Sequence, residues 1–327
     1  MKRTIAFLTG GYSGEAEISY KSAITIQNHL DKDKWEVYTI DITHQGWYCE
    51  IGKEKIEIDR NDFSLNTDDG RKIKFDVVFI GIHGTPGEDG KLQGYLDIIG
   101  LPYTSCDAAT SALTFNKRFT VGVAHMAGLN VAKSVHLFKQ QTISPEKILS
   151  TLKLPLFVKP NNGGSSIGMS KVISPVELPA ALEKAFKEDD QVLVEEYIKG
   201  REFTIGVYKS KGKVIPLPIT EIISKKDFFD YEAKYLGASE EITPAKIDKA
   251  LEELIKTEAV KAYSVFNCQG VIRIDFIFNE EEQKAYMLEI NTIPGQSEAS
   301  IVPQQVAAAG INLKDFYNTL LEECIVL

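Results

Sequence analysis

Residues 271–278 read VIRIDFIF, in which two charged side chains interrupt an apolar run. Successive side chains of a β-strand point to opposite faces, so Arg273 and Asp275 share one face and the apolar residues at even positions form the other. Burying such charges is costly unless they are paired or bind a cation. This stretch therefore predicts a core strand with one polar, functional face.

Residues 287–291, MLEIN, repeat the design, because Glu289 and Asn291 fall on one face of a second predicted strand. Carboxylate and amide oxygens are ligands that suit Mg²⁺, which usually keeps waters and substrate phosphates in its shell. The two strands together predict a magnesium site at Asp275, Glu289 and Asn291. The alternative, a buried Arg273–Asp275 salt bridge beside an edge carboxylate, stays open at this stage.

A loop rich in glycine and serine follows an earlier predicted strand near residues 156–159. Residues 159–166 read KPNNGGSS, which begins with Lys159 at the end of the strand. Glycines allow backbone N–H groups to converge on a phosphate, and serine hydroxyls add donors. A tight hairpin turn with a solvated lysine is the alternative. Taken with the carboxylates, the loop favours a metal–nucleotide site.

The standard nucleotide-binding patterns are missing. A P-loop requires Gly-Lys followed by Ser or Thr, but Leu92 follows Gly90-Lys91. Residues 10–14, GGYSG, lack the spacing of the Rossmann GxGxxG pattern. The sequence therefore argues against P-loop and standard dinucleotide-binding chemistry.

The N-terminal part alternates strand and helix patterns. Strands are predicted over 5–8, 36–42 and 75–80, and helices over 18–30 and 90–99. This order predicts a parallel sheet covered on both faces, with the more polar segment 46–70 as an excursion at the sheet edge.

The rest of the chain is predicted to begin with one long helix over 107–129, with Asp107 as its N-cap. Strands are predicted near 156–159, 169–173, 192–195, 271–278 and 285–291, with antiparallel strands over 202–218 and helices over 176–186 and 247–266. Residues 221–244 are irregular in pattern and predict a long loop of functional importance.

Composition excludes several classes of protein. The chain has 327 residues, 43% hydrophobic and 25% charged, which is typical of globular proteins and argues against disorder. The net charge of −9, without a basic stripe, argues against nucleic acid as a partner. No apolar run reaches the length of a membrane helix, and the N-terminus does not resemble a secretory signal. Four widely spaced cysteines predict reduced thiols, so we expect a cytoplasmic protein without membrane contact.

Several motifs in order resemble the ATP-grasp enzymes and, more narrowly, the D-alanine–D-alanine ligase family. Besides Lys159 and its loop, they are residues 10–15, 83–84, 87–90, 194–196, 230–235, 273–275 and 289–295. The resemblance extends from residue 3 to the last helix. It implies a mixed α/β and α+β fold, with a Rossmann-like N-terminal domain over 1–106 followed by a two-lobed ATP-grasp fold. The central lobe would span 107–200, and the C-terminal lobe 201–327.

The resemblance also implies a nucleotide site. Lys117 and Lys159 match lysines that contact ATP phosphates, Ser166 belongs to the loop over them, and Glu202 matches a ribose ligand. Glu195 and Glu196 match the strand that reads adenine. Asp275, Glu289 and Asn291 match ligands of Mg²⁺, for which Mn²⁺ is a possible substitute.

The implied reaction joins two D-alanine molecules at the cost of ATP, through an acyl phosphate, for peptidoglycan precursor synthesis. Glu15 matches the carboxylate that receives the first ammonium group, linked to Ser165 and Tyr235, and Arg273 and the Gly295 N–H match the oxyanion stabilisers. His83, Lys234, Ser300 and Ile301 fall on the substrate side. A homodimer is expected from the resemblance alone.

One departure from the family pattern concerns substrate choice. Gln296-Ser297 stands where the family often carries Met-Thr. The Lys234-Tyr235 pair resembles members that form dipeptides rather than D-alanine–D-lactate ligases, which favours an amine as the nucleophile. Another ATP-grasp ligase with different substrates, and a non-catalytic nucleotide-binding regulator, are the remaining alternatives.

Overall fold

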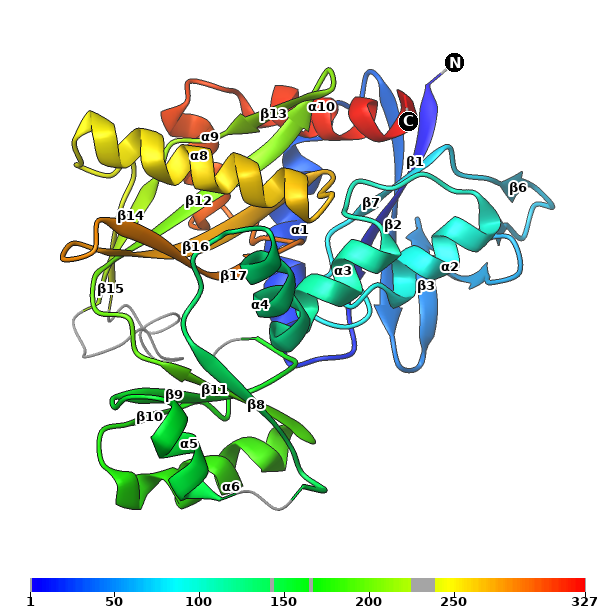
Figure 1. The fold of residues 1–327 in the computed structure, drawn as a ribbon. Coiled ribbons are helices and arrows are strands. Elements are labelled where there is room, and N and C mark those ends of the chain that lie inside the picture. Colours follow the sequence, from blue (N-terminus) through cyan, green and yellow to red (C-terminus); the bar gives the residue numbers. More distant parts are fainter. Residues whose placement is uncertain (1, 142–143, 165–166, 225–238, 327) are drawn as a thin grey trace.

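The computed structural model of the chain describes residues 2–141, 144–164, 167–224 and 239–326. These residues form three β-sheets that follow one another along the sequence, each with its own helices (Figure 1). The sheets mark an N-terminal part, a central lobe and a C-terminal lobe.

The first sheet has seven strands in the order β6-β5-β4-β3-β2-β1-β7. They are β1 (Arg3–Gly10), β2 (Trp35–Thr43), β3 (Gly46–Ile51), β4 (Glu54–Asp59), β5 (Ser64–Asn66), β6 (Lys72–Ile73) and β7 (Val77–Ile80). The predicted parallel sheet is confirmed, because β2, β1 and β7 pair in parallel, and the strands beyond β2, for which no pairing was predicted, pair antiparallel. Short turns join those outer strands, and a parallel crossover needs a connection of about a dozen residues. The segment 46–70 lies at the sheet edge, as predicted.

Both faces of the parallel part are covered, as the apolar strands predicted. On β1, Ile5 and Phe7 pack with α1 (Ala16–His29) and α10 (Leu313–Val326). The alternate residues Ala6 and Leu8 pack on the other face with α2 (Lys91–Ile99).

The long helix predicted over 107–129 is wrong, because the structure has two helices there. They are α3 (Ala108–Phe115), with Asp107 as N-cap, and α4 (Lys117–Met126). Asn116 separates them with extended backbone angles, and its side chain accepts a hydrogen bond from the Phe119 N–H at 3.1 Å. An asparagine that caps a new helix competes with continuation of the old one.

The central lobe is a four-stranded sheet in the order β10-β9-β11-β8. Its elements are β8 (Ser134–Phe138), α5 (Pro145–Thr151), β9 (Leu156–Pro160), β10 (Ser170–Val172), the 3₁₀ turn η1 (Pro175–Glu177), α6 (Leu178–Glu188) and β11 (Gln191–Glu196). The sequence analysis missed β8 and α5. The lobe has a separate core, which includes Leu152, Leu182 and Val194.

The C-terminal lobe is a six-stranded sheet with α8 (Lys249–Val265) against it. Its strands are β12 (Arg201–Ser210), β13 (Lys213–Pro216), β14 (Thr220–Ser224), β15 (Ser239–Ile242), β16 (Val271–Asn279) and β17 (Lys284–Asn291), and α9 (Ile301–Ala308) follows. The prediction of a loop over 221–244 is wrong at both ends, where β14 and β15 pair antiparallel. Residues 225–238 lie outside the described residues.

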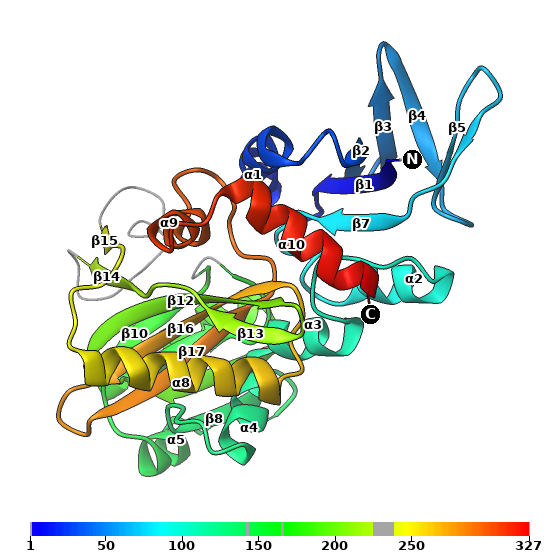
Figure 2. The same cartoon turned by 90° about the horizontal axis from the view of Figure 1, so that it is seen from above.

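The last helix joins the first and third sheets. Figure 2 shows α10 between them, and its residues Phe316 and Leu320 share one core with Phe7 of β1 and Tyr208 of β12. The N-terminal sheet therefore depends on the C-terminal end of the chain for one of its covered faces.

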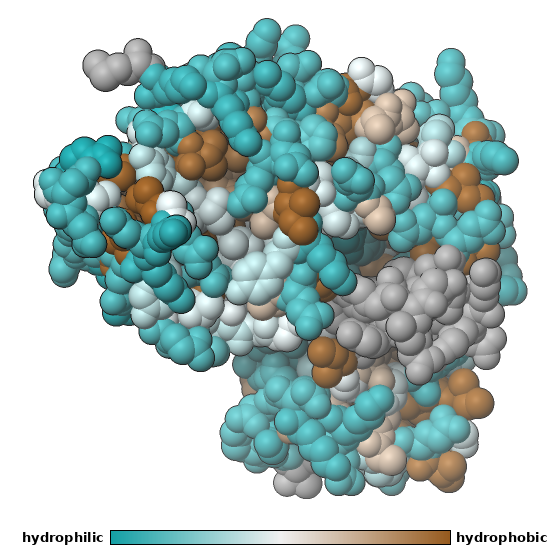
Figure 3. Space-filling model, turned by 180° about the vertical axis from the view of Figure 1, so that it is seen from behind, coloured by the Kyte–Doolittle hydropathy of each residue, from teal (hydrophilic) through white to brown (hydrophobic). Residues whose placement is uncertain are grey.

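The protein surface and the cysteine side chains agree with what the composition predicted. Figure 3 shows hydrophilic residues over most of one face, with hydrophobic residues in small groups among them. Among the described residues, we find no helix with the length and hydropathy needed to span a bilayer. The four cysteines are free thiols, as predicted.

Candidate active site

The polar faces of β16 and β17 lie against each other. In the antiparallel register, Asp275 is opposite Glu289 and Arg273 is opposite Asn291. The strand register shifts directly after Asp275. The prediction that these residues line one face of two neighbouring strands is therefore confirmed.

The salt bridge that the sequence left open is present as well. Arg273 donates from Nε and Nη2 to the two oxygens of Asp275, at 2.9 and 2.8 Å. The Thr204 hydroxyl also donates to Asp275, at 2.5 Å. Burial opposes the charge of Arg273, but the adjacent Asp275 carboxylate outweighs it and raises the pKa of the guanidinium. Asp275 thus forms an ion pair with Arg273 and, together with Glu289, makes up the acidic face.

Two cavities meet at this acidic face. One has a volume of about 400 Å³ and lies between the central and C-terminal sheets, and the other, of about 460 Å³, extends toward the N-terminal part. The residues that line both are Lys117, Gly163, Gly164, Glu202, Ile222, Asp275 and Glu289. A group transferred between molecules in the two cavities would therefore pass the Asp275–Glu289 pair.

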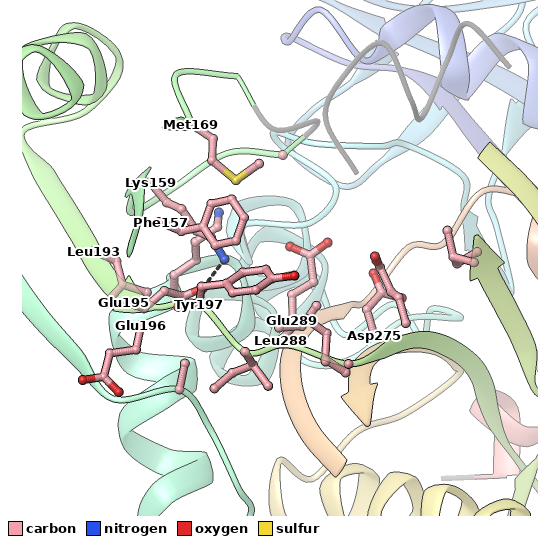
Figure 4. Close-up of a pocket in the computed structure, with 18 of the residues that line it drawn as sticks. Phe157, Lys159, Met169, Leu193, Glu195, Glu196, Tyr197, Asp275, Leu288 and Glu289 are labelled. Carbon is pink, nitrogen blue, oxygen red and sulfur yellow. Dashed lines mark hydrogen bonds and ion pairs between the residues drawn. The ribbon is translucent and has the colours of Figure 1, made fainter. Parts of the chain in front are cut away.

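The first cavity has apolar walls with charged groups at both ends (Figure 4). Phe157 and Met169 lie at one end near the Lys159–Glu195 ion pair, and Leu288 lies at the other end with Glu289 and Asp275. Such a cavity suits a molecule with a flat apolar part and a charged part.

The lysines and acids predicted around the nucleotide line this cavity. Lys159 forms an ion pair with Glu195 across β9 and β11, and both side chains are largely buried. The Glu196 carboxylate accepts a hydrogen bond from the Lys153 N–H at 2.8 Å. Lys117 donates to the carbonyl of Gly163 at 2.7 Å and so links α4 to the glycine loop.

The second cavity collects the predicted substrate residues. Glu15, His83, Gly295, Ser300 and Ile301 line it. Their neighbours on the cavity wall include Arg273 and Asn291 from the C-terminal lobe. The second cavity thus combines side chains of the N-terminal part and the C-terminal lobe.

The start of α1 approaches the glycine loop closely. A Cβ atom placed on Gly164 would lie 2.9 Å from Glu15 Oε1, so only glycine allows this approach without a shift. Four predicted site residues, Ser165, Ser166, Lys234 and Tyr235, lie outside the described residues. The contact at Gly164 nevertheless brings the segment before Ser165 to Glu15.

Sequence analysis assigned no role to Glu88, which also lines the second cavity. Glu88 accepts hydrogen bonds from the N–H groups of Gly84 (2.8 Å) and Ile293 (3.3 Å). Burial, with the nearby charge of Glu15, raises the pKa of Glu88 to about 8. The motif of residues 87–90 could have drawn attention to Glu88. The burial that raises its pKa was not predictable, because it depends on segments distant in sequence such as the one at Ile293.

His83 is buried in the same region. Burial lowers the pKa of its imidazole to about 4, so His83 is neutral near pH 7. Its Nε2 lies 3.0 Å from the Ser22 hydroxyl. His83 therefore borders the cavity as a neutral group with protein partners.

A metal would find oxygen ligands at the acidic face. Within the described residues there is no cluster of three or more His, Cys, Asp or Glu side chains that could hold an ion. The set on β16 and β17 has two carboxylates and the amide of Asn291, which is a ligand set for a hard cation that keeps other oxygen ligands. The residues present fit such a cation better than zinc, which prefers His and Cys.

Solved structures define the class of protein. The chain matches the VanG D-Ala:D-Ser ligase from Enterococcus faecalis with a TM-score of 0.90 and 32% identity, covering 98% of this chain and 99% of that one. It matches D-alanyl-alanine synthetase A from Vibrio cholerae with a TM-score of 0.89 and 30% identity, covering 100% and 99%. The fold is thus that of an ATP-grasp ligase.

The family follows from the sequence comparisons. The family models described as D-ala D-ala ligase N-terminus and C-terminus match residues 4–106 and 121–322. A D-alanine–D-alanine ligase from Flavobacterium johnsoniae is 47% identical over 321 residues, 98% of each chain. One from Parabacteroides distasonis is 44% identical over 324 residues, 99% of this chain and 98% of the other. The chain belongs to the D-alanine–D-alanine ligase family.

Proposed function

We propose that this protein is an ATP-dependent ligase that joins two D-alanine molecules into D-alanyl-D-alanine for peptidoglycan precursor synthesis. The observation that carries the proposal is the meeting of two cavities at Asp275 and Glu289. A carboxylate is a poor acyl donor, and phosphorylation by ATP gives it a good leaving group. The amine of the second D-alanine then attacks the acyl phosphate and releases phosphate.

ATP occupies the first cavity in this proposal. Phe157, Met169 and Leu288 enclose the adenine, which Glu195 and Glu196 read, and Glu202 binds the ribose. Lys117 and Lys159 contact the phosphates, with Ser166 on the loop above them. The close Lys159–Glu195 pair supports a site in which the lysine is held in place before the nucleotide arrives.

A divalent cation, Mg²⁺ with Mn²⁺ as a possible substitute, is held by Asp275, Glu289 and Asn291 in this proposal. When bound, it neutralises negative charge on the phosphates. Arg273 has a second role here, because its ion pair orients the Asp275 carboxylate at the junction of the cavities.

The amino acids occupy the second cavity. Glu15 receives the ammonium of the first D-alanine and is linked to Ser165 and Tyr235. Arg273 and the Gly295 N–H stabilise the oxyanion that forms when the amine attacks. His83, Lys234, Ser300 and Ile301 border the substrates. The contact between Glu15 and Gly164 supports a closed arrangement that keeps water from the acyl phosphate.

The remaining expectations are also proposals. The domains are 1–106, 107–200 and 201–327, the protein acts in the cytoplasm, and it forms a homodimer. Light scattering tests the dimer against the chain mass of 36.4 kDa.

The first experiment measures ADP release with ATP and Mg²⁺ and identifies the product by mass. D-Alanine, L-alanine, and mixtures of D-alanine with D-lactate or D-serine are compared. We expect ADP with D-alanine but not with L-alanine, and D-alanyl-D-alanine as the main product even in the mixtures. A mixed product would show that D-lactate or D-serine, rather than D-alanine, is the second substrate. The absence of ADP with every substrate and mixture would refute the proposed function.

A further inference from the structure

His83 lies between two segments that are far apart in sequence. On one side, the Ser22 hydroxyl of α1 is 3.0 Å from Nε2 of the His83 ring. On another side, Ile293, two residues before Gly295, lines the same small cavity as His83 and Ser22. Ser22 is fully buried and His83 is 6% exposed, so water does not compete readily for these contacts.

The hydrogen bonds around Ser22 join His83 to the segment of residues 293–296. The Gln296 N–H donates to the Ser22 oxygen at 3.1 Å. The hydroxyl proton of Ser22 is then available for Nε2 of a neutral His83.

The segment of residues 293–296 is held from several directions. Glu88 accepts from the Ile293 N–H at 3.3 Å, while Ser22 accepts from the Gln296 N–H. Tyr317 of α10 donates to the Gln296 side chain at 3.2 Å. Gly295, whose N–H is the proposed oxyanion donor, lies between these anchored residues.

We propose that Ser22 is a positioning residue for ligation. Its hydroxyl donates to His83 Nε2 and accepts the N–H of Gln296, and so fixes the Gly295 N–H, one residue earlier, relative to Arg273. The Ser22–His83 pair then acts as a clamp between the N-terminal part and the C-terminal lobe, and His83 is not a proton donor to substrate. This inference rests on the proposed function.

Long-range ¹H–¹⁵N spectra of the histidine rings test the clamp directly. Protonated and unprotonated ring nitrogens have well-separated shifts, and the His83 signals are assigned by their loss in His83→Gln. We expect the wild-type ring to be neutral, with its proton on Nδ1. In Ser22→Ala we expect the signals to indicate a mixture of tautomers. A wild-type ring with its proton on Nε2, or a charged ring at pH 7, would overturn the inference.

Ser19→Ala is a matched control on the same helix. Ser19 is also fully buried and accepts the His83 backbone N–H at 2.9 Å, but it is not bonded to the ring. We expect the tautomer of His83 to be unchanged in Ser19→Ala. An equal change in both variants would show a general effect of lost buried hydroxyls and would overturn the specific role of Ser22.

Kinetics test the consequence for ligation. We expect Ser22→Ala to lower kcat about tenfold while the KM for ATP stays within about twofold, because the oxyanion donor shifts and the nucleotide cavity does not. Ser22→Thr keeps the hydroxyl, and a small cavity beside Ser22, of about 20 Å³, can receive the added methyl group. We expect it to restore kcat and the wild-type tautomer.

The positioning role of Ser22 and the proposed function would be refuted by different results. A wild-type kcat in Ser22→Ala, or an unrestored kcat in a folded Ser22→Thr that has the wild-type tautomer, would refute the positioning role. A wild-type protein that forms no ADP with D-alanine would refute the proposed function instead.

Discussion

At the scale of single residues, the acidic face of β16 and β17 takes part in a buried ion pair and in the proposed metal site. Asp275 and Glu289 are opposite each other, and two like charges at that distance repel unless positive charge is added. Arg273 supplies part of it through two hydrogen bonds to Asp275. A divalent cation, which we propose binds here, would add positive charge to the pair and would also offset the negative charge of the ATP phosphates.

Glu289→Gln tests this assignment. The substitution keeps the size of the side chain but removes the charge that holds the cation, so we expect kcat to fall by about 100-fold or more with the free energy of unfolding changed by less than about 1 kcal/mol. ADP release and urea unfolding measure the two effects. Glu281→Gln on the same hairpin is the control, because Glu281 is 82% exposed in a surface ion pair and should be neutral in both assays. Full activity in Glu289→Gln would exclude Glu289 as a metal ligand.

Glu88 gives a prediction for the dependence of stability on pH. Its pKa in the folded protein is about 8, above the ordinary value of 4.5. Between these values the folded state binds more protons than the unfolded state, so this group makes stability fall as the pH rises through that window.

Glu88→Gln lacks this titration. We expect the free energy of unfolding of the variant, relative to wild type, to increase by at least about 1 kcal/mol from about pH 5 to about pH 8. Urea unfolding at a series of pH values measures the difference. A constant difference across the window would mean that Glu88 titrates normally.

At the scale of elements, the break between α3 and α4 places Lys117, the lysine that we propose contacts the ATP phosphates. Asn116 caps α4 through the Phe119 N–H, and Lys117, the first residue of α4, reaches the Gly163 carbonyl. The geometry of Lys117 therefore depends on where α4 begins.

Asn116→Ala removes the cap. We expect a loss of about 1 kcal/mol in the free energy of unfolding, and a several-fold higher KM for ATP because Lys117 is less well placed. Urea unfolding and initial rates at varied ATP measure both. Asn116→Ser, which also caps helices, should recover most of each loss, and an alanine variant as stable as wild type would show that the cap contributes little.

The elements also show what a sequence can predict. The alternation in residues 271–278 is local, so the polar face of β16 was predictable, and the motif resemblance supplied the family. The break at Asn116 was not predictable, because the residues around it have good helical spacing. The start of α4 is held by the Asn116 side chain and by Asn161, which is distant in sequence and accepts from the N–H groups of Lys117 and Arg118. The pairing of β14 with β15, and the burial of Glu88 against Ile293, depend on contacts between distant segments that no local pattern contains.

At the scale of the whole molecule, the cores define which parts depend on one another. One core contains residues of β1 and β7 together with Phe316 and Leu320 of α10, and the Trp35 indole donates to Asn318 of α10 at 2.7 Å. The core of the central lobe is separate and consists of residues from 137 to 194. The N-terminal sheet and the C-terminal lobe should therefore unfold together, while the central lobe is able to unfold without them.

Two matched leucine substitutions test this division. Leu320 in the shared core and Leu152 in the central core are both 2% exposed, and each change to alanine should cost about 2–5 kcal/mol in its own core. Both tryptophans, Trp35 and Trp47, lie in the N-terminal part and report its unfolding in urea. We expect Leu320→Ala to lower the midpoint of the tryptophan transition although it lies more than 200 residues away in sequence from both reporters. Leu152→Ala should leave that midpoint unchanged and add an earlier transition in far-UV circular dichroism.

Two outcomes would contradict this division. If both variants lower the tryptophan midpoint equally, the chain unfolds as one unit. If Leu320→Ala leaves the midpoint unchanged, α10 does not stabilise the N-terminal sheet.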